Sequence, residues 1–184
     1  MTGSPMRSRP TTVNDLFAYC FSDGIVRIHD KIRTEWRPSL AAGQWPDMNI
    51  QLMLRRWLDR HQVNPQKIDR RLYAIYEHAA ARLNESVLYM PPALESISDK
   101  NQAFIYHYTD MILHTNEVIE DQWKPARKKG ERMDYDIGKV MRDYLEARSV
   151  SHYSLPNVLW ELFSSSMSVM YDYRDKKAFG YPIN

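Results

Sequence analysis

The sequence predicts an all-α fold, a single compact domain of about six helices with flexible N- and C-terminal arms, and three observations support this. Apolar side chains recur every three or four residues along most of the chain, as on one face of a helix. Strand signals are sparse, since no run of alternating β-branched residues is bounded by turn residues. The 184 residues, 43% of them hydrophobic, are enough to bury a core without disulfides or a structural metal.

Capping residues and prolines divide the chain into the six predicted helices. The signals are Asn14 and Pro38 for the first helix, Pro46 for the second, Asn64-Pro65 and Pro91-Pro92 for the third, Ser98 or Asp99 and Trp123 for the fourth, Tyr135 and Arg148 for the fifth, and Ser154 and Pro156 for the sixth. Within the first helix, the sequence Ser22-Asp23-Gly24 is expected to break or kink the chain. No internal repeat is found at the periods of solenoid proteins.

The predicted domain covers residues 12–171. Residues 1–11, with Gly3 and two prolines among Ser, Thr and Arg, are expected to form a flexible arm. Residues 172–184 are expected to form a C-terminal tail. Residues 124–132, which contain Pro125 and Gly130, are expected to form a basic loop.

The sequence places the protein in a reducing compartment outside the membrane. Cys20 is the single cysteine, so it forms no internal disulfide and no cysteine-type zinc site. The most apolar N-terminal stretch, residues 16–21, is far shorter than the roughly 20 residues that span a bilayer. We therefore expect a cytoplasmic protein with no membrane contact and no cofactor.

Charge is distributed unevenly along the chain. Residues 1–80 have a net charge of +4, residues 81–123 of −5 and residues 124–184 of +3. Such a pattern folds into internal salt bridges, forms a solvated surface, or lets the acidic part of one copy meet a basic part of another. The last alternative predicts a homo-oligomer or a subunit of a larger complex.

Basic side chains in the second and third helices and in the basic loop form the candidate binding surface. Phosphate groups of a nucleic acid would pair with such side chains without reading the base sequence. We expect this contact from Arg56, Arg60, Lys67, Arg71, Arg82, Lys124, Arg127, Lys128, Lys129 and Arg132. The sequence thus favours a non-enzymatic assembly or interaction subunit that binds nucleic acid, with RNA favoured, as nucleocapsid proteins and ribonucleoprotein small subunits do.

An enzyme is the first alternative, and its sharpest candidate site lies in the predicted fourth helix. His107, Asp110, His114 and Glu117 recur at spacings of three and four residues, with Asp121 four residues further on. Side chains at this spacing share one face of a helix, and such residues ligate metals in helical bundles. The apolar stripe of the same helix is centred about 140° away. We therefore expect this polar face to be solvated and to hold no metal.

Two arginine and histidine pairs offer a second enzyme candidate. Arg56 precedes His61, and Arg71 precedes His78 at a looser spacing. The pattern resembles the Arg-x4-6-His signature of the HEPN ribonucleases and covers nothing else of the chain. The resemblance implies a dimeric ribonuclease whose arginine holds phosphate and whose histidine helps activate the ribose hydroxyl. On a straight helix, however, Arg56 and His61 point about 140° apart.

The sequence contains none of the common nucleotide-binding or hydrolase motifs. We therefore predict no catalytic residues, and an enzyme is less favoured than a binding subunit. A protein-binding adaptor or effector that makes no contact with nucleic acid is the remaining alternative.

Overall fold

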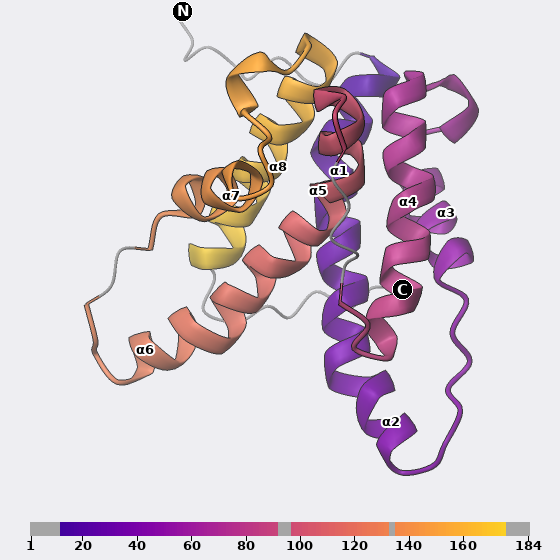
Figure 1. Cartoon of the computed structure of the whole chain (residues 1–184). Coiled ribbons are helices and arrows are strands. Elements are labelled where there is room, and N and C mark those ends of the chain that lie inside the picture. Colours follow the sequence, from indigo (N-terminus) through magenta and orange to yellow (C-terminus); the bar gives the residue numbers. More distant parts are fainter. Residues whose placement is uncertain (1–11, 92–96, 133–134, 176–184) are drawn as a thin grey trace, which may run out of the picture.

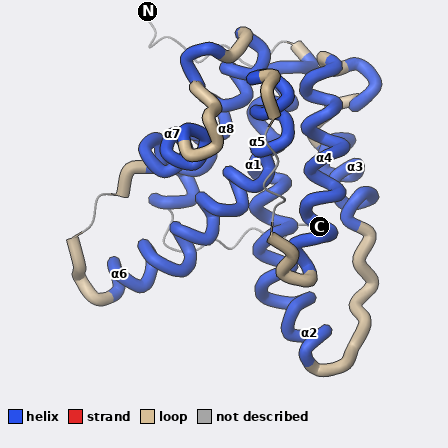
Figure 2. Tube along the Cα trace, viewed as in Figure 1, coloured by secondary structure: helices blue, strands red, loops and turns tan. Residues whose placement is uncertain are grey.

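The computed structural model describes residues 12–91, 97–132 and 135–175, and all regular structure in them is helical (Figure 1). Two π-helical segments, η1 (Ile32–Trp36) and η3 (Val118–Trp123), join α1 to α2 and α5 to α6 without a break, so the described residues form six continuous helices (Figure 2). The all-α prediction is therefore confirmed. The α-helices are α1 (Val13–Lys31), α2 (Arg37–Ala41), α3 (Ile50–Arg60), α4 (Arg70–Val87), α5 (Lys100–Glu117), α6 (Lys124–Lys128), α7 (Ile137–Glu146) and α8 (Asn157–Asp175).

The first long helix differs from its prediction at both ends. Its N-cap is Thr12, and the predicted cap Asn14 instead accepts a hydrogen bond from the backbone N–H of Asp69 at 2.9 Å. The helix passes Gly24 without a break and continues beyond Pro38 to Ala41. The prediction that Pro38 ends this helix is therefore wrong.

A π-helical segment precedes the proline in both long helices. Pro38 follows η1, and Pro125 follows η3. A proline clashes with the carbonyl of the preceding turn of an α-helix, and the wider π turn relieves this clash while the helix continues. As a consequence, Lys124–Lys128 form helix α6, and the prediction of a basic loop over residues 124–132 is wrong for its first half.

The predicted arms lie mostly outside the described residues. Residues 1–11 and 176–184 are not described. The last helix, α8, continues to Asp175, so the helical domain extends past its predicted end at residue 171. Within the described residues, no helix is both long and apolar enough to cross a membrane.

The chain contains two copies of one helical unit, which the search at solenoid periods missed. The first copy contains α1 to α4 and the second contains α5 to α8, and every α-helix of the second copy begins 87 residues after its counterpart in the first. The 3-10 turns that precede the last helix of each copy, η2 (Pro65–Lys67) and η4 (His152–Ser154), are also 87 residues apart. The left-handed residues repeat too, with φ of 61° at both Gln62 and Ser149. The order of elements is therefore duplicated without insertion or deletion.

The sequence repeats at the same spacing. Buried and turn residues recur 87 positions apart, and this indicates a duplication of the whole unit rather than a chance likeness of helices. The identical pairs include Asn14 and Asn101, Phe17 and Phe104, Tyr19 and Tyr106, Asp23 and Asp110, Ile25 and Ile112, Trp36 and Trp123, Pro38 and Pro125, Gly43 and Gly130, Ile50 and Ile137, Leu58 and Leu145, and Leu72 and Leu159.

The two copies exchange their last helices. Helix α1 packs along α8 and helix α5 packs along α4, so each long helix is covered by the final helix of the other copy. Exchanging the copies leaves this arrangement unchanged, which is the relation of two subunits about an approximate twofold axis. The long helices cross at their middle and then diverge toward α2 and α6 (Figure 1). A single core, which includes Phe17, Phe104 and Phe163, runs through both copies.

Candidate ligand-binding cleft

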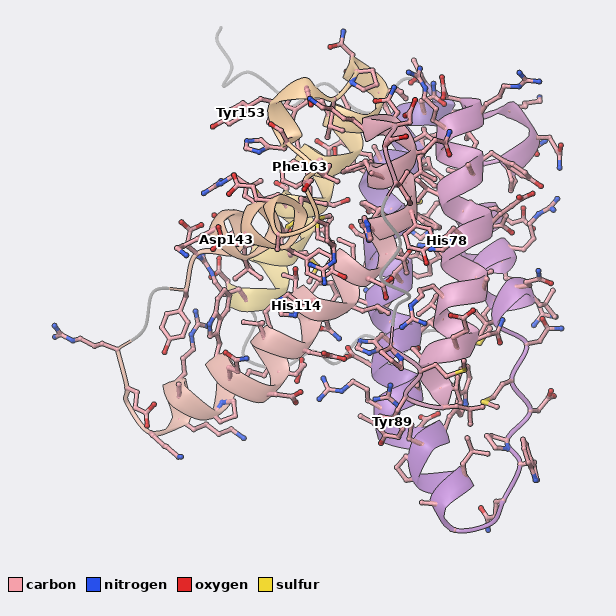
Figure 3. All side chains as sticks on the ribbon, in the orientation of Figure 1. His78, Tyr89, His114, Asp143, Tyr153 and Phe163 are labelled. Atoms are coloured by element: carbon pink, nitrogen blue, oxygen red, sulfur yellow. The ribbon has the colours of Figure 1, made fainter. Side chains whose placement is uncertain are left out.

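A polar cleft of about 1030 Å³ lies between the diverging parts of the two long helices. Helices α1 and α2 with η1 form one wall, and α5 with η3 forms the opposite wall. The end of α4 and the segment after it close one end, and α7 closes the other. Tyr89 and His114, both labelled in Figure 3, belong to two different walls. The cleft is thus built by both copies of the repeated unit.

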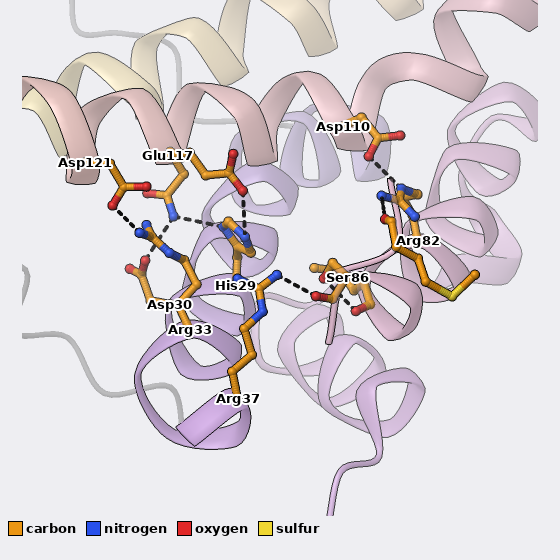
Figure 4. A network of polar contacts seen from close by, with 12 residues as sticks. His29, Asp30, Arg33, Arg37, Arg82, Ser86, Asp110, Glu117 and Asp121 are labelled. Atoms are coloured by element: carbon orange, nitrogen blue, oxygen red, sulfur yellow. Dashed lines mark hydrogen bonds and ion pairs between the residues drawn. The ribbon is translucent and has the colours of Figure 1, made fainter. Parts of the chain in front are cut away.

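A buried ion pair forms the inner end of the cleft. The guanidinium of Arg82 donates from Nε to Asp110 Oδ1 at 2.6 Å (Figure 4). It also donates from Nη1 to Glu85 at 2.7 Å. Its Nη2 donates to the carbonyl of Met90 at 2.6 Å, which ties the segment after α4 to the cleft. The side chains of Arg82 and Asp110 are 6% and 5% exposed, so this pair lies inside the protein.

Asp110 has a second carboxylate oxygen that is buried and has no hydrogen-bond partner. Burial raises the pKa of the Asp110 carboxyl, and the hydrogen bond from Arg82 opposes this rise. A buried acceptor without a partner costs free energy that a ligand or a water recovers by donating a hydrogen bond. Oδ2 of Asp110 is therefore a buried acceptor, on a residue that lines the cleft, for which a ligand or a water would supply the donor.

His29 and Asn116 connect the two walls. The side-chain amide of Asn116 donates to Nδ1 of His29 at 3.1 Å and to Asp30 at 2.9 Å (Figure 4). Nε2 of His29 points toward Glu117 at 3.7 Å, which is too long for a hydrogen bond. Burial, with smaller effects of two nearby arginines, lowers the pKa of His29 to about 3, so the imidazole is neutral at physiological pH.

Two arginines in the walls lie over tyrosine rings. The guanidinium of Arg37 is 3.9 Å from the centre of the Tyr89 ring and donates to the carbonyl of Ser86 at 2.5 Å. The guanidinium of Arg148 is 3.5 Å from the centre of the Tyr144 ring. Neither arginine has an ion pair with a described carboxylate. The cleft thus presents ring faces, positive charge and an unpaired carboxylate oxygen together.

The equivalent position in the other copy is filled. Asp23, the counterpart of Asp110, accepts hydrogen bonds from Arg27 and from the hydroxyl of Tyr173. Tyr173 occupies the sequence position that corresponds to Ser86, which lines the cleft. A buried tyrosine therefore occupies on one face the place that a serine leaves open on the other.

The counterpart aromatic residues Trp57 and Tyr144 also differ in their surroundings. Trp57 packs directly against Gly24, where an added Cβ would lie 2.6 Å from the indole ring. Its Nε1 donates to the carbonyl of Cys20 at 2.8 Å. The counterpart of Gly24 is Met111, so Tyr144, the counterpart of Trp57, has no such hollow to enter and lines the cleft instead.

The predicted nucleic-acid-binding residues do not form one surface. Arg82 is buried, so its assignment to an outer cationic surface is wrong. Arg71 pairs with Asp69 at 3.0 Å, Lys124 pairs with Glu120 and lines the cleft, and Arg127 donates to the carbonyl of Arg174. The remaining predicted residues are exposed: Arg56, Arg60 and Lys67 on α3 and η2, and Lys128, Lys129 and Arg132 at and after the end of α6. Helices α3 and α6 lie on opposite sides of the molecule (Figure 1).

The polar stripe of α5 is buried at one end and exposed at the other. His107 and Asp110 are buried beside α4, whereas His114, Glu117 and Asp121 are exposed, and Asp110, His114, Glu117 and Asp121 line the cleft. The expectation of a solvated face is therefore wrong for His107 and Asp110 and is confirmed for the other three residues. In the described part of the chain, no group of three or more His, Cys, Asp or Glu side chains is placed to hold a metal ion.

The two pairs that resemble the HEPN signature are engaged elsewhere. Nδ1 of His61 lies 2.9 Å from the carbonyl of Trp57, whereas Arg56 is exposed on α3. The ring of His78 packs on Tyr106, and Arg71 forms its ion pair at the start of α4. Neither pair lines the cleft.

Sequence reasoning missed Ser86, Arg37 and Tyr144 as residues of the site. The 87-residue spacing would have indicated Ser86. At this spacing the counterpart of Ser86 is Tyr173, whereas the aspartates Asp23 and Asp110 are identical in the two copies. Comparisons with protein-family models, with curated proteins and with solved structures find no match to this chain.

Proposed function

We propose that this protein is a binding protein whose cleft between the two long helices holds a small polar molecule. The observation that carries the proposal is the buried and unpartnered Oδ2 of Asp110, which lies in a charged cleft at a position that a tyrosine fills in the other copy. Large clefts with converging polar groups and perturbed carboxylates are the usual places of ligand binding.

The polar groups around the cleft are held before any ligand arrives. Arg82 is fixed by three hydrogen bonds, and Arg33 and Asp121 form an ion pair across the two walls. Fixed groups lose little conformational freedom on binding, so more of the interaction energy contributes to affinity. The arrangement therefore supports recognition of a molecule of defined shape.

The test is equilibrium dialysis of the protein against a small-molecule extract of cells, with mass spectrometry as the readout. The comparison variant is S86Y, which places on this face the side chain that fills the other. S86A is the matched control, because it keeps the cleft open and removes only an intrahelical hydrogen bond to Leu83. We expect a compound enriched by the wild type and S86A but not by S86Y. Equal enrichment by all three proteins, or none, would refute the proposal.

A second candidate function is sequence-independent contact with nucleic acid, RNA in the first instance, through α3 and η2. Arg56 and Lys67 are exposed and have no carboxylate of the described residues within ion-pair distance, and Arg60 is exposed on the same helix as Arg56. Exposed arginine and lysine side chains near one another favour contact with phosphates.

This candidate is tested by filter binding of single-stranded RNA over a range of salt concentrations. We expect the affinity to fall steeply as salt rises, and R56E/K67E to lower it at every concentration. K100E/K139E, at the start of α5 and on α7, is the control, because it changes the net charge by the same amount. Failure to retain RNA at about 50 mM salt, or equal losses in both variants, would exclude this surface.

A further inference from the structure

We propose that the ligand of the cleft presents an aromatic hydroxyl group, a phenol, to the free oxygen of Asp110. This inference rests on the proposed function and names the chemical class of the ligand. It follows from a comparison of the two copies within the chain, since the filled copy shows which group completes the same arrangement.

The filled copy contains a carboxylate, a guanidinium and a phenol. Oδ1 of Asp23 accepts from Nε of Arg27 at 2.9 Å and also from the hydroxyl of Tyr173. Tyr173 is buried within the hydrophobic core, where its ring packs among apolar side chains. The hydroxyl of this buried ring reaches a partly exposed carboxylate, and a hydrogen bond to a charged group is stronger than one between neutral groups.

In the open copy the guanidinium comes from a different helix, and the phenol is absent: the counterpart of Arg27 is His114, and Arg82 on α4 contacts Asp110 instead. Arg82 supplies the guanidinium to Asp110 Oδ1, and Oδ2 has no partner. Ser86, at the position that corresponds to Tyr173, donates its hydroxyl to the carbonyl of Leu83 within its own helix at 2.7 Å. The serine thus neither fills the space nor satisfies the aspartate.

A neutral donor suits this position better than a cation. Arg82 already contacts Asp110, and the positive charges of Arg82 and Arg148 both act on its carboxyl group. An ammonium group placed beside Oδ2 would meet these charges at close range, whereas a phenol hydroxyl supplies the hydrogen bond without added charge. The exposed ring of Tyr89 at the end of the cleft offers a surface for an aromatic ligand.

The size of the cleft indicates that the phenol is one end of a larger molecule. A volume of about 1030 Å³ exceeds that of a single ring several times over. The remaining space is lined by cations and carboxylates alike, among them the ion pairs Arg33–Asp121 and Lys124–Glu120, so the far end of the ligand is expected to be polar.

The test uses 4-methylphenol, which is the side chain of tyrosine, and 4-methylanisole, which has the same shape but no donor. Binding to the intact protein is followed by backbone amide NMR shifts. We expect 4-methylphenol to bind with a Kd of the order of 1 mM and at least about tenfold more tightly than 4-methylanisole, since one hydrogen bond to a charged acceptor is lost. S86Y is expected to abolish the binding and S86A to preserve it.

A second variant tests the internal comparison on the opposite face. Y173A removes the native phenol beside Asp23, and 4-methylphenol is expected to bind there in addition and to raise the melting temperature of this variant more than that of the wild type. If Y173A does not fold, the S86Y and anisole comparisons still decide.

The outcomes separate this inference from the proposed function. Equal affinity for 4-methylphenol and 4-methylanisole, or no binding of either, together with an enriched compound in the dialysis experiment, would overturn the phenol class and leave the cleft as a binding site. No binding in either experiment would overturn both.

Discussion

His29 contacts Asn116, the residue that occupies its own position in the second copy, with 3.1 Å between Nδ1 and the amide nitrogen. A residue touches its counterpart only near the axis that relates two copies, so this pair marks the approximate twofold axis of the protein. The axis passes through the crossing of the long helices, beside the cleft. The two copies differ beside this axis, since Ser86 and Tyr144 of the cleft correspond to Tyr173 and Trp57.

Replacement of His29 by asparagine is expected to flatten the pH dependence of stability. The pKa of His29 is lowered to about 3 in the folded protein and returns to about 6.5 on unfolding. The unfolded chain therefore binds more protons between these values, and the contribution of His29 to stability is lost as the pH falls through this range. Between pH 6.5 and about 5, the wild type should lose roughly 1–2 kcal/mol more than H29N.

Urea unfolding at a series of pH values measures this difference. The carboxyl groups of Asp30, Asp110 and Glu117, whose pKa values burial raises, titrate in both proteins, so the comparison isolates the histidine. Parallel stability curves for the two proteins would show that folding does not lower the pKa of His29.

Substitution of the two helical glycines with alanine is expected to have opposite effects. A Cβ at Gly24 would lie 2.6 Å from the buried ring of Trp57, so G24A should displace this ring from the Cys20 carbonyl and cost about 1–3 kcal/mol. At Gly138 the nearest atom is the end of the flexible Arg142 side chain, at 2.7 Å. G138A should therefore stabilise the protein by up to about 1 kcal/mol through helix propensity. Thermal unfolding of both variants checks this, and destabilisation of equal size would contradict it.

Loss of Arg82 alone is expected to be more costly than loss of the whole ion pair. R82M leaves the Asp110 carboxylate buried without its partner, and about 3–5 kcal/mol of stability should be lost. In R82M/D110L no buried charge remains, so part of this loss should be recovered. A double-mutant cycle by urea denaturation measures the coupling. Purely additive losses would show that the two side chains do not depend on each other.

The pair of Tyr108 and Ser166 is expected to tolerate replacement only together. Their hydroxyl oxygens lie 2.5 Å apart in the core, and the counterpart residues in the first copy are Phe21 and Ala79. S166A removes this partner from a fully buried hydroxyl and should cost about 1–3 kcal/mol. The double variant Y108F/S166A recreates the apolar arrangement of the first copy and should be more stable than S166A. Chemical denaturation of both variants provides the measurement, and a double variant less stable than S166A would contradict the prediction.

Sequence patterns predicted the fold class and the number of helices, and they failed where a local signal was overridden. Proline predicted helix ends at Pro38 and after Trp123, but π-helical turns carry both helices onward. Such turns have no simple sequence signal, and their presence before both prolines became visible only in the structure.

The candidate site could be predicted only in part. The spacing of Asp110, His114 and Glu117 correctly placed them on one face of a helix, and the expectation that this face meets solvent holds for His114 and Glu117 but fails at Asp110, which is buried. Helix α5 has α4 beside it and contacts α1 and α7 as well, so a polar face can be covered by another helix. Arg82 was predicted to be exposed but is buried, because it pairs with Asp110 on α5, and the sequence does not show that α4 and α5 are adjacent.

The exchange of final helices has a consequence for the order in which the chain assembles. Helix α1 is synthesised early, yet its long neighbour α8 leaves the ribosome last of all the described helices. The part of α1 that α8 covers therefore stays exposed after α3, α4 and α5 have been made, and contacts between such distant segments slow folding and favour transient association. Nascent chains are thus expected to be most prone to association through this face of α1 before α8 emerges.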